Sequence, residues 1–393
     1  MQETADILII GGGVIGVSIA YHLAQRQAGR ILLLERESLA AGSTGRSVGS
    51  IDGLTLRPHA VDLFAHSAIF FAQCDELLGV PCGFVSTGLV VLAGSEQKEE
   101  LATAVSRTQA AGLPSELLSL DELATLEPRM ALDGVAVAGF TPAAGYADPV
   151  LTTQAFAGAA RRLGVEIRQG QAVMSIRHDG KRIVGVETAV GSIHAPVVIV
   201  AAGPWSGSLL HTAGIDLPLQ PVRHPVVCLR RPPDFGRAHH SLLDLTNNIY
   251  ARPESGGLTL LGSINPDMGY DPIQADDGAG YVHDAYISWT MAHLTQRYLS
   301  LEKSQLLKGW AGIMTTTPDW QPIIGRLPDL PGLFCAAGFS GQGFQISPAV
   351  GRYLAAVLVG DTITQLIPFS PERFTTGRLL QTKRGGDTYG LLG

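Results

Sequence analysis

Three glycines and an acid near the N-terminus have the types and spacing needed to hold a dinucleotide. Gly11, Gly13 and Gly16 form a Gly-x-Gly-x-x-Gly motif, and Glu35 follows 24 residues after Gly11 (35 − 11). The first glycine allows a tight turn, the second lets a pyrophosphate approach the backbone, and the third lets a helix pack on a strand. A carboxylate at Glu35 can accept hydrogen bonds from ribose hydroxyls. The motif alone does not separate NAD from FAD.

The residues around this motif predict a strand, a helix and a second strand in succession. Residues 7–10 form an unbroken apolar run, as expected for a strand buried on both faces of a parallel sheet. A helical pattern begins at Val14 and Ile15, and residues 31–34 form a second apolar run that leads into Glu35. The free N–H groups and the positive dipole end of that helix favour phosphates. Because every part stands where the fingerprint requires it, we favour this interpretation over an ordinary glycine turn.

A small, polar and glycine-rich segment follows the second strand, over residues 39–50. Its N–H and hydroxyl donors suit the phosphates and ring of a cofactor, although a plain flexible loop has the same composition. Two later apolar runs, at residues 197–202 and 332–337, also end in small residues. The second run leads into the glycine-rich residues 338–345 and then a helical pattern. Open α/β sheets bind ligands at the carboxyl ends of such strands.

The order of strand and helix patterns predicts an α/β protein with two intertwined domains. Parallel-sheet strands are expected in residues 5–50, 150–206 and 320–360, and antiparallel strands in residues 84–145 and 218–312. The predicted fold is a Rossmann-type nucleotide-binding domain, interrupted by an antiparallel-sheet α+β substrate domain. The predicted boundaries are 1–83, 146–217 and 315–370 for the nucleotide-binding domain, 84–145 and 218–314 for the substrate domain, and 371–393 for an irregular tail.

Composition and charge exclude several classes of partner. The formal net charge is −7 over 393 residues and no basic block occurs, which argues against nucleic acid and anionic membranes. No apolar stretch reaches the roughly 18–20 residues of a transmembrane segment, and no secretory leader is recognised. We therefore expect a cytoplasmic protein. The cysteines show no metal-binding or redox spacing, so we expect buried thiols and no metal at Cys74, Cys82, Cys228 and Cys335.

Five motifs together make the chain similar to a known family. They are residues 11–16 with Glu35, residues 42–47, residues 200–205, residues 317–319 and residues 338–344. Over nearly its whole length the chain resembles the D-amino-acid-oxidase-type flavoproteins. Within that family it resembles the branch that holds sarcosine oxidases and dehydrogenases and the subunits of dye-linked proline, hydroxyproline and opine dehydrogenases. The resemblance implies FAD in the nucleotide-binding domain and oxidation of an amine C–N bond next to a carboxylate, by hydride transfer to the flavin.

The resemblance also implies where the cofactor binds. Glu35 would meet the adenosine ribose, and Val173 would meet the adenine through its backbone. The last glycine-rich loop would lie at the flavin edge that gains negative charge on reduction, where a helix N-terminus is stabilising. The predicted cofactor-binding residues are Gly11, Gly13, Val14, Ile15, Gly16, Glu35, Arg36, Gly42, Ser43, Thr44, Gly45, Arg46, Ser47, Val173, Ala202, Gly203, Trp205, Gly312, Gly338, Phe339, Ser340, Gly341, Gln342, Gly343 and Phe344.

The chain departs from the family pattern in three respects. The cysteine that tethers the flavin in monomeric sarcosine oxidases falls at about Gly312, so we expect non-covalent FAD. The lysine that promotes reaction with oxygen falls at about Thr259, which favours a poor oxygen user. The arginine and the second basic residue that clamp the substrate carboxylate fall at about Asp52 and Gln345, which leaves the exact substrate open.

Tyr250 matches the active-site tyrosine of the family, and Arg252 lies two residues later on the same strand face. An arginine can hold a carboxylate through two parallel hydrogen bonds. We therefore predict Tyr250, Arg252 and Gln345 as the catalytic residues. An equally weighted alternative makes Arg252 a rim residue that pairs with Glu254 or Asp244.

Four further residues carry weaker arguments. Arg57 and Arg223 are substitutes for Arg252 as the carboxylate ligand. We interpret His224 as a core histidine whose hydrogen bonds are made by its neighbours, in preference to a catalytic residue. Asp52 could receive a cationic group on a larger substrate, such as the guanidinium of an opine, although a role in its own loop is the simpler interpretation.

The predicted activity is FAD-dependent oxidation of the C–N bond of an amino or imino acid, such as hydroxyproline, proline, sarcosine, a D-amino acid or an opine. The chain would be the catalytic subunit of a heteromeric dehydrogenase, since a second redox centre would need a partner chain. The alternatives are a peroxide-forming oxidase and a non-catalytic FAD-binding assembly factor. An NAD-linked dehydrogenase is disfavoured, because NAD sites do not need the second and third glycine-rich segments.

Overall fold

A parallel sheet forms around the first long strand of the chain. The computed structural model describes residues 3–278 and 280–380. The sheet has the order β10 (Glu166–Arg168), β3 (Ile31–Leu34), β2 (Ile7–Ile10), β14 (Val197–Val200), β21 (Leu333–Ala337) and β20 (Ile323–Arg326). Neighbouring strands pair in parallel, except that β20 runs antiparallel to β21. The parallel sheet is confirmed, whereas the edge strand β20 was not predicted.

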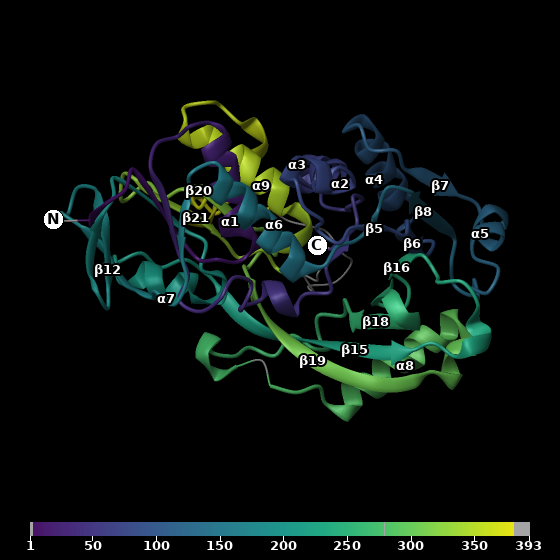
Figure 1. Ribbon diagram of the computed structural model, residues 1–393. Helices are drawn as coiled ribbons and strands as arrows, with labels where there is room; N and C mark the ends of the chain where they lie inside the picture. Colours follow the sequence, from purple (N-terminus) through teal and green to yellow (C-terminus); the bar gives the residue numbers. More distant parts are fainter. Residues whose placement is uncertain (1–2, 279, 381–393) are drawn as a thin grey trace.

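Both faces of this sheet are buried, which explains its unbroken apolar runs. Helices α1 (Val14–Gln25), α6 (Pro149–Arg162) and α9 (Gly343–Leu358) lie together on one face (Figure 1). A smaller sheet covers the other face, with the short helix α7 (Ser206–His211) beside it. That sheet has the order β1 (Glu3–Thr4), β13 (Gly191–His194), β12 (Ile183–Thr188) and β11 (Val173–His178), and β11 and β12 form an antiparallel hairpin.

An eight-stranded sheet forms the other half of the molecule. Its order is β19 (Gln305–Thr316), β15 (Gln220–Arg230), β18 (Leu258–Ser263), β17 (Ile249–Glu254), β16 (Ser241–Asp244), β6 (Leu89–Ala93), β8 (Val137–Thr141) and β7 (Glu116–Leu118). Helix α8 (Asp284–Arg297) packs on one face and α4 (Lys98–Ala110) on the other. The pairing is antiparallel as predicted, except between β16 and β6. These two strands come from separate excursions of the chain, so no hairpin dictates their direction.

Short elements connect the two halves. The strands β4 (Ser50–Ile51), β9 (Gly145–Tyr146) and β5 (Val85–Ser86) form a small sheet. The remaining helices are α2 (Val61–Ala72), α3 (Cys74–Leu78), α5 (Leu120–Leu126) and α10 (Glu372–Thr375). The described 3-10 helices are η1 (Thr44–Arg46), η2 (Pro58–Ala60), η3 (Gly203–Trp205), η4 (Pro233–Phe235), η5 (Ser255–Gly257), η6 (Ala275–Asp277), η7 (Leu299–Lys303) and η8 (Thr364–Phe369). Ser119 caps α5 in a capping box with Glu122.

The segment that follows residue 370 is more ordered than the sequence suggested. Arg373 is 5% exposed and forms two hydrogen bonds with Asp319, from Nε to Oδ2 at 2.8 Å and from Nη2 to Oδ1 at 3.1 Å. Burial alone would raise the pKa of Asp319, but the hydrogen bonds and charge of Arg373 hold it below its usual value. Residues 371–380 are thus part of the packed structure, and residues 381–393 of the predicted tail lie outside the described residues.

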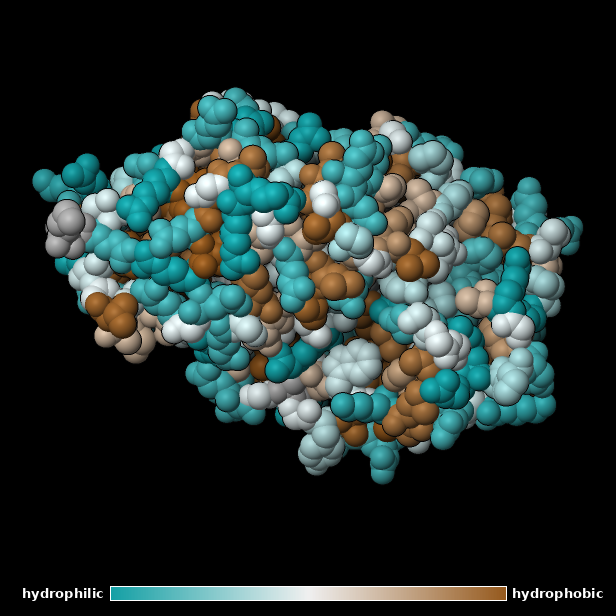
Figure 2. Space-filling model, viewed as in Figure 1, coloured by the Kyte–Doolittle hydropathy of each residue, from teal (hydrophilic) through white to brown (hydrophobic). Residues whose placement is uncertain are grey.

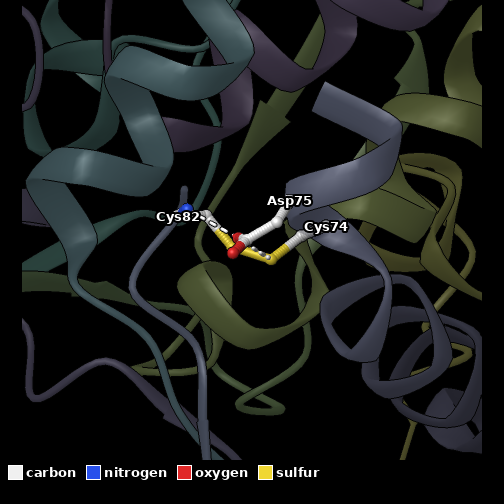
Figure 3. A group of neighbouring side chains, drawn as sticks. All are labelled: Cys74, Asp75 and Cys82. Atoms are coloured by element: carbon white, nitrogen blue, oxygen red, sulfur yellow. Dashed lines mark hydrogen bonds between the residues drawn. A yellow bond between two sulfur atoms is a disulfide. The ribbon is translucent and has the colours of Figure 1, made fainter. Parts of the chain in front are cut away.

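Two of the four cysteines are not thiols, contrary to the expectation. Cys74 and Cys82 form a disulfide, whereas Cys228 and Cys335 are free and buried. In Figure 3 the carboxylate of Asp75 lies beside this disulfide, and its Oδ1 accepts a hydrogen bond from the N–H of Cys82 at 2.8 Å. The three side chains lie close enough to hold a metal ion, but metal-binding cysteines are thiolates and the disulfide removes both. A spacing of eight residues matches no redox motif, so this pairing could not be predicted from the sequence.

Candidate functional site

A cavity of about 630 Å³ lies where the carboxyl ends of the parallel strands face the eight-stranded sheet. Ile10 and Leu34, at the ends of β2 and β3, line one side of it. Leu243 of β16 and Ala251 of β17 line the other. The ends of a parallel sheet and the face of an antiparallel sheet therefore share one concave site, as ligand sites between domains commonly do.

All but two of the predicted cofactor-binding residues line this cavity. The exceptions are Gly16 and Gly45, which pack against backbone. A Cβ at Gly16 would stand 2.0 Å from the backbone oxygen of Gly11, and a Cβ at Gly45 would stand 2.6 Å from that of Ala40. These two glycines therefore allow close approach of the chain to itself rather than contact with a ligand.

The N-terminus of α1 opens into the cavity without a cap from its own N-cap residue. Its N-cap residue, Gly13, makes no capping hydrogen bond, and Gly11 before it adopts φ +116°. The hydroxyl of Thr44 accepts a hydrogen bond from the N–H of Val14 at 3.2 Å, which ties the second glycine-rich segment to this turn. Free N–H groups at the positive end of a helix are the donors that a phosphate needs.

The carboxylate of Glu35 is held rigidly at the cavity wall. Its Oε2 accepts a hydrogen bond from the N–H of Gly12 at 2.6 Å, and its Oε1 accepts one from the N–H of Glu37 at 2.8 Å. Both oxygens keep lone pairs for ribose hydroxyls, so the geometry suits the predicted role.

A cationic and an aromatic side chain stack beside Glu35. The guanidinium of Arg36 lies 3.7 Å from the ring centre of Trp205, and Trp205 Nε1 donates to Asp276 Oδ1 at 2.6 Å. Arg36 also approaches Asp276, with Nη1 3.6 Å from Oδ1. Arg36 and Trp205 were both predicted to contact the cofactor, and their side chains meet here. Asp276 was not predicted as a site residue, because no motif in the sequence marks its segment.

A second helix begins at the cavity, at the end that the resemblance assigns to the flavin. Helix α9 starts at Gly343, and its N-cap residue Gln342 makes no side-chain capping bond. The loop before it bends sharply, with φ +68° at Gly338, +49° at Ser340 and +87° at Gly341. This bend presents the first N–H groups of a 16-residue helix to the cavity.

Tyr250 and His224 form a hydrogen-bonded pair on the wall contributed by the eight-stranded sheet. The Tyr250 hydroxyl lies 3.0 Å from Nε2 of His224, whose Nδ1 lies 3.3 Å from the backbone oxygen of Gly269. Burial lowers the pKa of His224 to about 4 and raises that of Tyr250 well above its usual value. Both rings are therefore neutral at pH 7, with Nδ1 of His224 donating to Gly269 and Nε2 accepting from Tyr250.

Asp52 and Gln345 were predicted to stand where the family has its carboxylate clamp, and they contact each other at the wall of the cavity. The N–H of Asp52 donates to Oε1 of Gln345 at 3.0 Å. Burial raises the pKa of Asp52 from 3.8 to about 6, and a hydrogen bond with Gln345 offsets only part of that rise. Asp52 has no ion-pair partner among the described residues.

Arg252 does not line the cavity. Its side chain donates to the backbone oxygens of Val48 and Pro253 and to Oε2 of Glu254 at 3.0 Å, and its guanidinium lies 4.1 Å from the ring centre of Tyr146. The alternative interpretation, a rim arginine paired with Glu254, describes this geometry. Arg252 shares a strand face with Tyr250, but its side chain is long enough to reach the loop that contains Val48. It therefore does not enter the cavity.

The substitute residues are also outside the cavity. Arg57 is fully buried, donates to Gln342 Oε1 at 2.8 Å, and has its pKa lowered to about 9 by burial. Arg223 and Thr259 do not line the cavity either, and Thr259 instead lies 2.9 Å from Nε2 of His239. The predicted match of Thr259 to the oxygen-promoting lysine stays a prediction, although Thr259 itself does not line the cavity. No lysine lines the described part of the cavity.

Comparison with known proteins adds a family to this geometry. The family described as "FAD dependent oxidoreductase" (DAO) matches residues 6–357. The chain belongs to this family. Among solved structures, L-proline dehydrogenase from P. horikoshii superimposes with a TM-score of 0.86 at 27% identity, covering 96% of this chain and 99% of that one. Glycine oxidase from Geobacillus kaustophilus superimposes with a TM-score of 0.80 at 26% identity, covering 95% and 99%.

Curated relatives of the chain include longer proteins. It is 31% identical to 4-methylaminobutanoate oxidase (formaldehyde-forming) of Paenarthrobacter nicotinovorans, over 90% of this chain and 44% of that protein. It is 29% identical to human mitochondrial sarcosine dehydrogenase, over 90% of this chain and 40% of that protein. The chain thus spans less than half the length of these two relatives. None of the described helices has both the length and the apolar character needed to cross a membrane.

The described cavity fits FAD, the cofactor of the family. Two helices begin there without side-chain caps, at Gly13 and at Gln342, and each leaves backbone donors facing the cavity. Gly312 lines the cavity and no cysteine does so in the described part of the chain, which supports the expected non-covalent attachment. Acid precipitation tests that expectation, since non-covalent flavin passes to the supernatant.

Gly13→Glu should give a protein that folds but purifies without flavin. The backbone at Gly13 has φ −72°, which any residue can adopt, and a Cβ would meet only the Thr44 hydroxyl, at 3.2 Å. The new carboxylate would occupy the place of the pyrophosphate and repel it. Gly158→Glu on α6 is the matched control, and flavin content per chain by absorbance is the measurement. Stoichiometric flavin in the Gly13 variant would contradict the assignment of this turn.

Asp52→Asn should stabilise the protein at high pH and not at low pH. The folded-state pKa of about 6 lies above the ordinary 3.8, so ionisation of Asp52 costs stability as the pH rises through that window. The cost above pH 6 is at most about 3 kcal/mol, because one pKa unit corresponds to roughly 1.4 kcal/mol. Thermal unfolding of both proteins at pH 4.5 and pH 8 measures it. If the unfolding temperatures of the two proteins differed equally at pH 4.5 and at pH 8, Asp52 would not be the titrating group.

Proposed function

We propose that this chain oxidises the C–N bond of an amino or imino acid with FAD as the electron acceptor. The observation that carries the proposal is the shared cavity, which is lined both by the N-termini of α1 and α9 and by the hydrogen-bonded Tyr250 and His224. A relative at 27% identity is named L-proline dehydrogenase and another at 29% is named glycine oxidase, which supports the same chemistry. FAD, when bound, supplies an acceptor for the hydride that leaves the carbon next to nitrogen.

Tyr250 is the group that positions the substrate nitrogen. Because Nδ1 of His224 is occupied by the backbone oxygen of Gly269, its Nε2 accepts the proton of the Tyr250 hydroxyl. The phenol oxygen then presents its lone pairs to an N–H of the substrate. No charged base is needed at this point, since an amine that enters deprotonated already carries the electron pair that expels hydride.

The proposed electron acceptor downstream of FAD is a dye, a quinone or a partner protein rather than oxygen. A positive charge near a reduced flavin stabilises the superoxide formed in the first electron transfer to oxygen. No lysine lines the described cavity, and the guanidinium of Arg46 is exposed and turned toward the backbone oxygens of Ala41 and Gly42. Among the described lining residues, no lysine or arginine is thus placed for oxygen chemistry.

A heteromeric assembly is part of the proposal. One relative is named sarcosine oxidase subunit beta, at 29% identity over 96% of this chain. Strand β19 lies at an edge of the eight-stranded sheet, and Leu306 and Leu307 on it are 47% and 40% exposed. Apolar patches also interrupt the hydrophilic face in Figure 2. Exposed edge strands and apolar patches are surfaces that partner chains commonly cover. The cytoplasmic location stays a prediction.

A non-catalytic assembly factor and a peroxide-forming oxidase are the alternatives. Anaerobic mixing of the flavin-loaded protein with a panel of amino and imino acids distinguishes an assembly factor from an enzyme, because only an enzyme would have its flavin bleached. Tyr250→Phe should slow bleaching about 10- to 100-fold, the effect of losing one polar contact to the substrate. Tyr281→Phe is the matched control, since Tyr281 is 71% exposed and outside the cavity. Bleaching by no member of the panel would favour the assembly factor.

Reoxidation of the substrate-reduced protein separates a dehydrogenase from an oxidase. We expect slow return of the flavin absorbance in air and fast return with an artificial dye or a soluble quinone. Stopped-flow absorbance measures both, and a peroxide assay checks the product in air. Peroxide formed at the rate of dye reduction would contradict the proposed acceptor and make the chain an oxidase.

A further inference from the structure

Charge is distributed unevenly along the cavity. Among its described lining residues the basic side chains are Arg36 and Arg46, and both belong to the segments that hold the dinucleotide end. Arg36 lies over Trp205, and Arg46 is exposed and bonded to its own loop. At the end that holds Tyr250, the acidic lining residue is Asp52. That end therefore offers a negative charge, whereas the guanidinium of Arg57, which donates to Oε1 of Gln342 at 2.8 Å, lies outside the described cavity lining.

The rest of the wall at this end cannot supply the missing positive charge. The residues that line it around Asp52 are mostly apolar and buried, namely Leu54, Leu56, Phe64, Leu89, Val91, Leu243 and Ile264. The ring of His224 is neutral, because burial lowers its pKa to about 4. A ligand carboxylate placed here would lose its hydration without gaining a cation and would be repelled by Asp52.

Asp52 is built to face the cavity. Its backbone N–H is fixed to Oε1 of Gln345 in the first turn of α9, so the loop cannot swing the carboxylate outward without breaking that bond. With Oε1 used in this way, the amide NH₂ of Gln345 is left to donate beside the carboxylate. The pair thus forms an acceptor site on a mostly apolar wall, which suits an ammonium or guanidinium group.

We propose that Asp52, positioned by Gln345, selects substrates that carry a second, positively charged nitrogen. The inference rests on the proposed oxidation of a C–N bond. The nitrogen that reacts must be uncharged, because its lone pair forms the new C=N bond as hydride leaves the neighbouring carbon. The cation at Asp52 is therefore a different nitrogen of the same molecule. Among amino and imino acids, the substrate class is therefore a basic amino acid or a guanidino-substituted imino acid, with its carboxylate directed away from Asp52. A diamine carries the same cation without the carboxylate and serves as a probe of the site.

Matched pairs of compounds test this proposal on the FAD-loaded protein. Sarcosine is compared with N-methylethylenediamine, and proline with aminomethylpyrrolidine, so that within each pair an aminomethyl group replaces the carboxylate. Anaerobic flavin reduction gives the rates, and the shift of the flavin absorption band on mixing gives the binding constants. We expect the diamine of each pair to bind more tightly and to react faster with the wild-type protein.

Two variants of Asp52 then assign the preference. Asp52→Asn should weaken diamine binding roughly 30-fold or more, the size expected for a buried charge pair, and should leave carboxylate binding unchanged or improved. Asp52→Arg should invert the preference within each pair. Asp121→Asn, which removes one negative charge from the exposed first turn of α5, is the control and should change neither.

The outcomes separate this inference from the proposed function. Faster reaction with sarcosine and proline, unchanged in Asp52→Asn, would overturn the inference and leave C–N oxidation in place. Tight, Asp52-dependent binding of the diamines without flavin reduction would support the inference and overturn the proposed function. Binding of neither member of any pair would overturn both.

Discussion

The structure depends on how closely the backbone of the first glycine turn approaches its neighbours. A Cβ at Gly11 would stand 2.3 Å from the backbone oxygen of Ala201, and one at Gly16 would stand 2.0 Å from that of Gly11. These distances leave no room for any side chain, so the ends of β2 and β14 and the start of α1 can approach this closely only with glycine at both positions. The same contact that completes the core of the parallel sheet turns the free N–H groups of α1 toward the cavity.

A second set of contacts makes the cavity one site rather than two half-sites. The hydroxyl of Ser43 donates to the backbone oxygen of Ile313, and Nε1 of Trp310 donates to that of Arg46 at 2.9 Å. Both bonds join the glycine-rich segment after β3 to strand β19 of the eight-stranded sheet. Because that sheet also carries Tyr250 and His224, a cofactor bound at the glycines is held against the groups that face the substrate.

Local patterns in the sequence predicted the dinucleotide end well, because its parts are short-range. The glycine spacing, the apolar runs and the acid at Glu35 lie within one strand–helix–strand unit, and 23 of the 25 predicted cofactor residues line the cavity. The two residues that do not line it are Gly16 and Gly45. They are glycines like the others, but they pack against backbone atoms of the chain and not against the cavity. Sequence alone does not distinguish these two uses of glycine.

The substrate end was predicted less well, because it is assembled from distant segments. Alternation along β17 places Arg252 on the face of Tyr250, but only the fold shows that Val48 and Glu254 take up its guanidinium. His224 joins Tyr250 through hydrogen bonds from residues 26 and 45 positions away, which no local motif records. The disulfide of Cys74 was missed for a related reason, since its spacing has no signature.

A crystal structure of the purified, flavin-containing protein tests the central claim most directly. The claim is that one cavity holds FAD between two uncapped helix N-termini, with its reactive ring against the wall of Tyr250. We predict electron density for the pyrophosphate at the N-terminus of α1, and for the flavin ring between the start of α9 and Tyr250. Flavin bound elsewhere, or a ring separated from Tyr250 by other side chains, would contradict it.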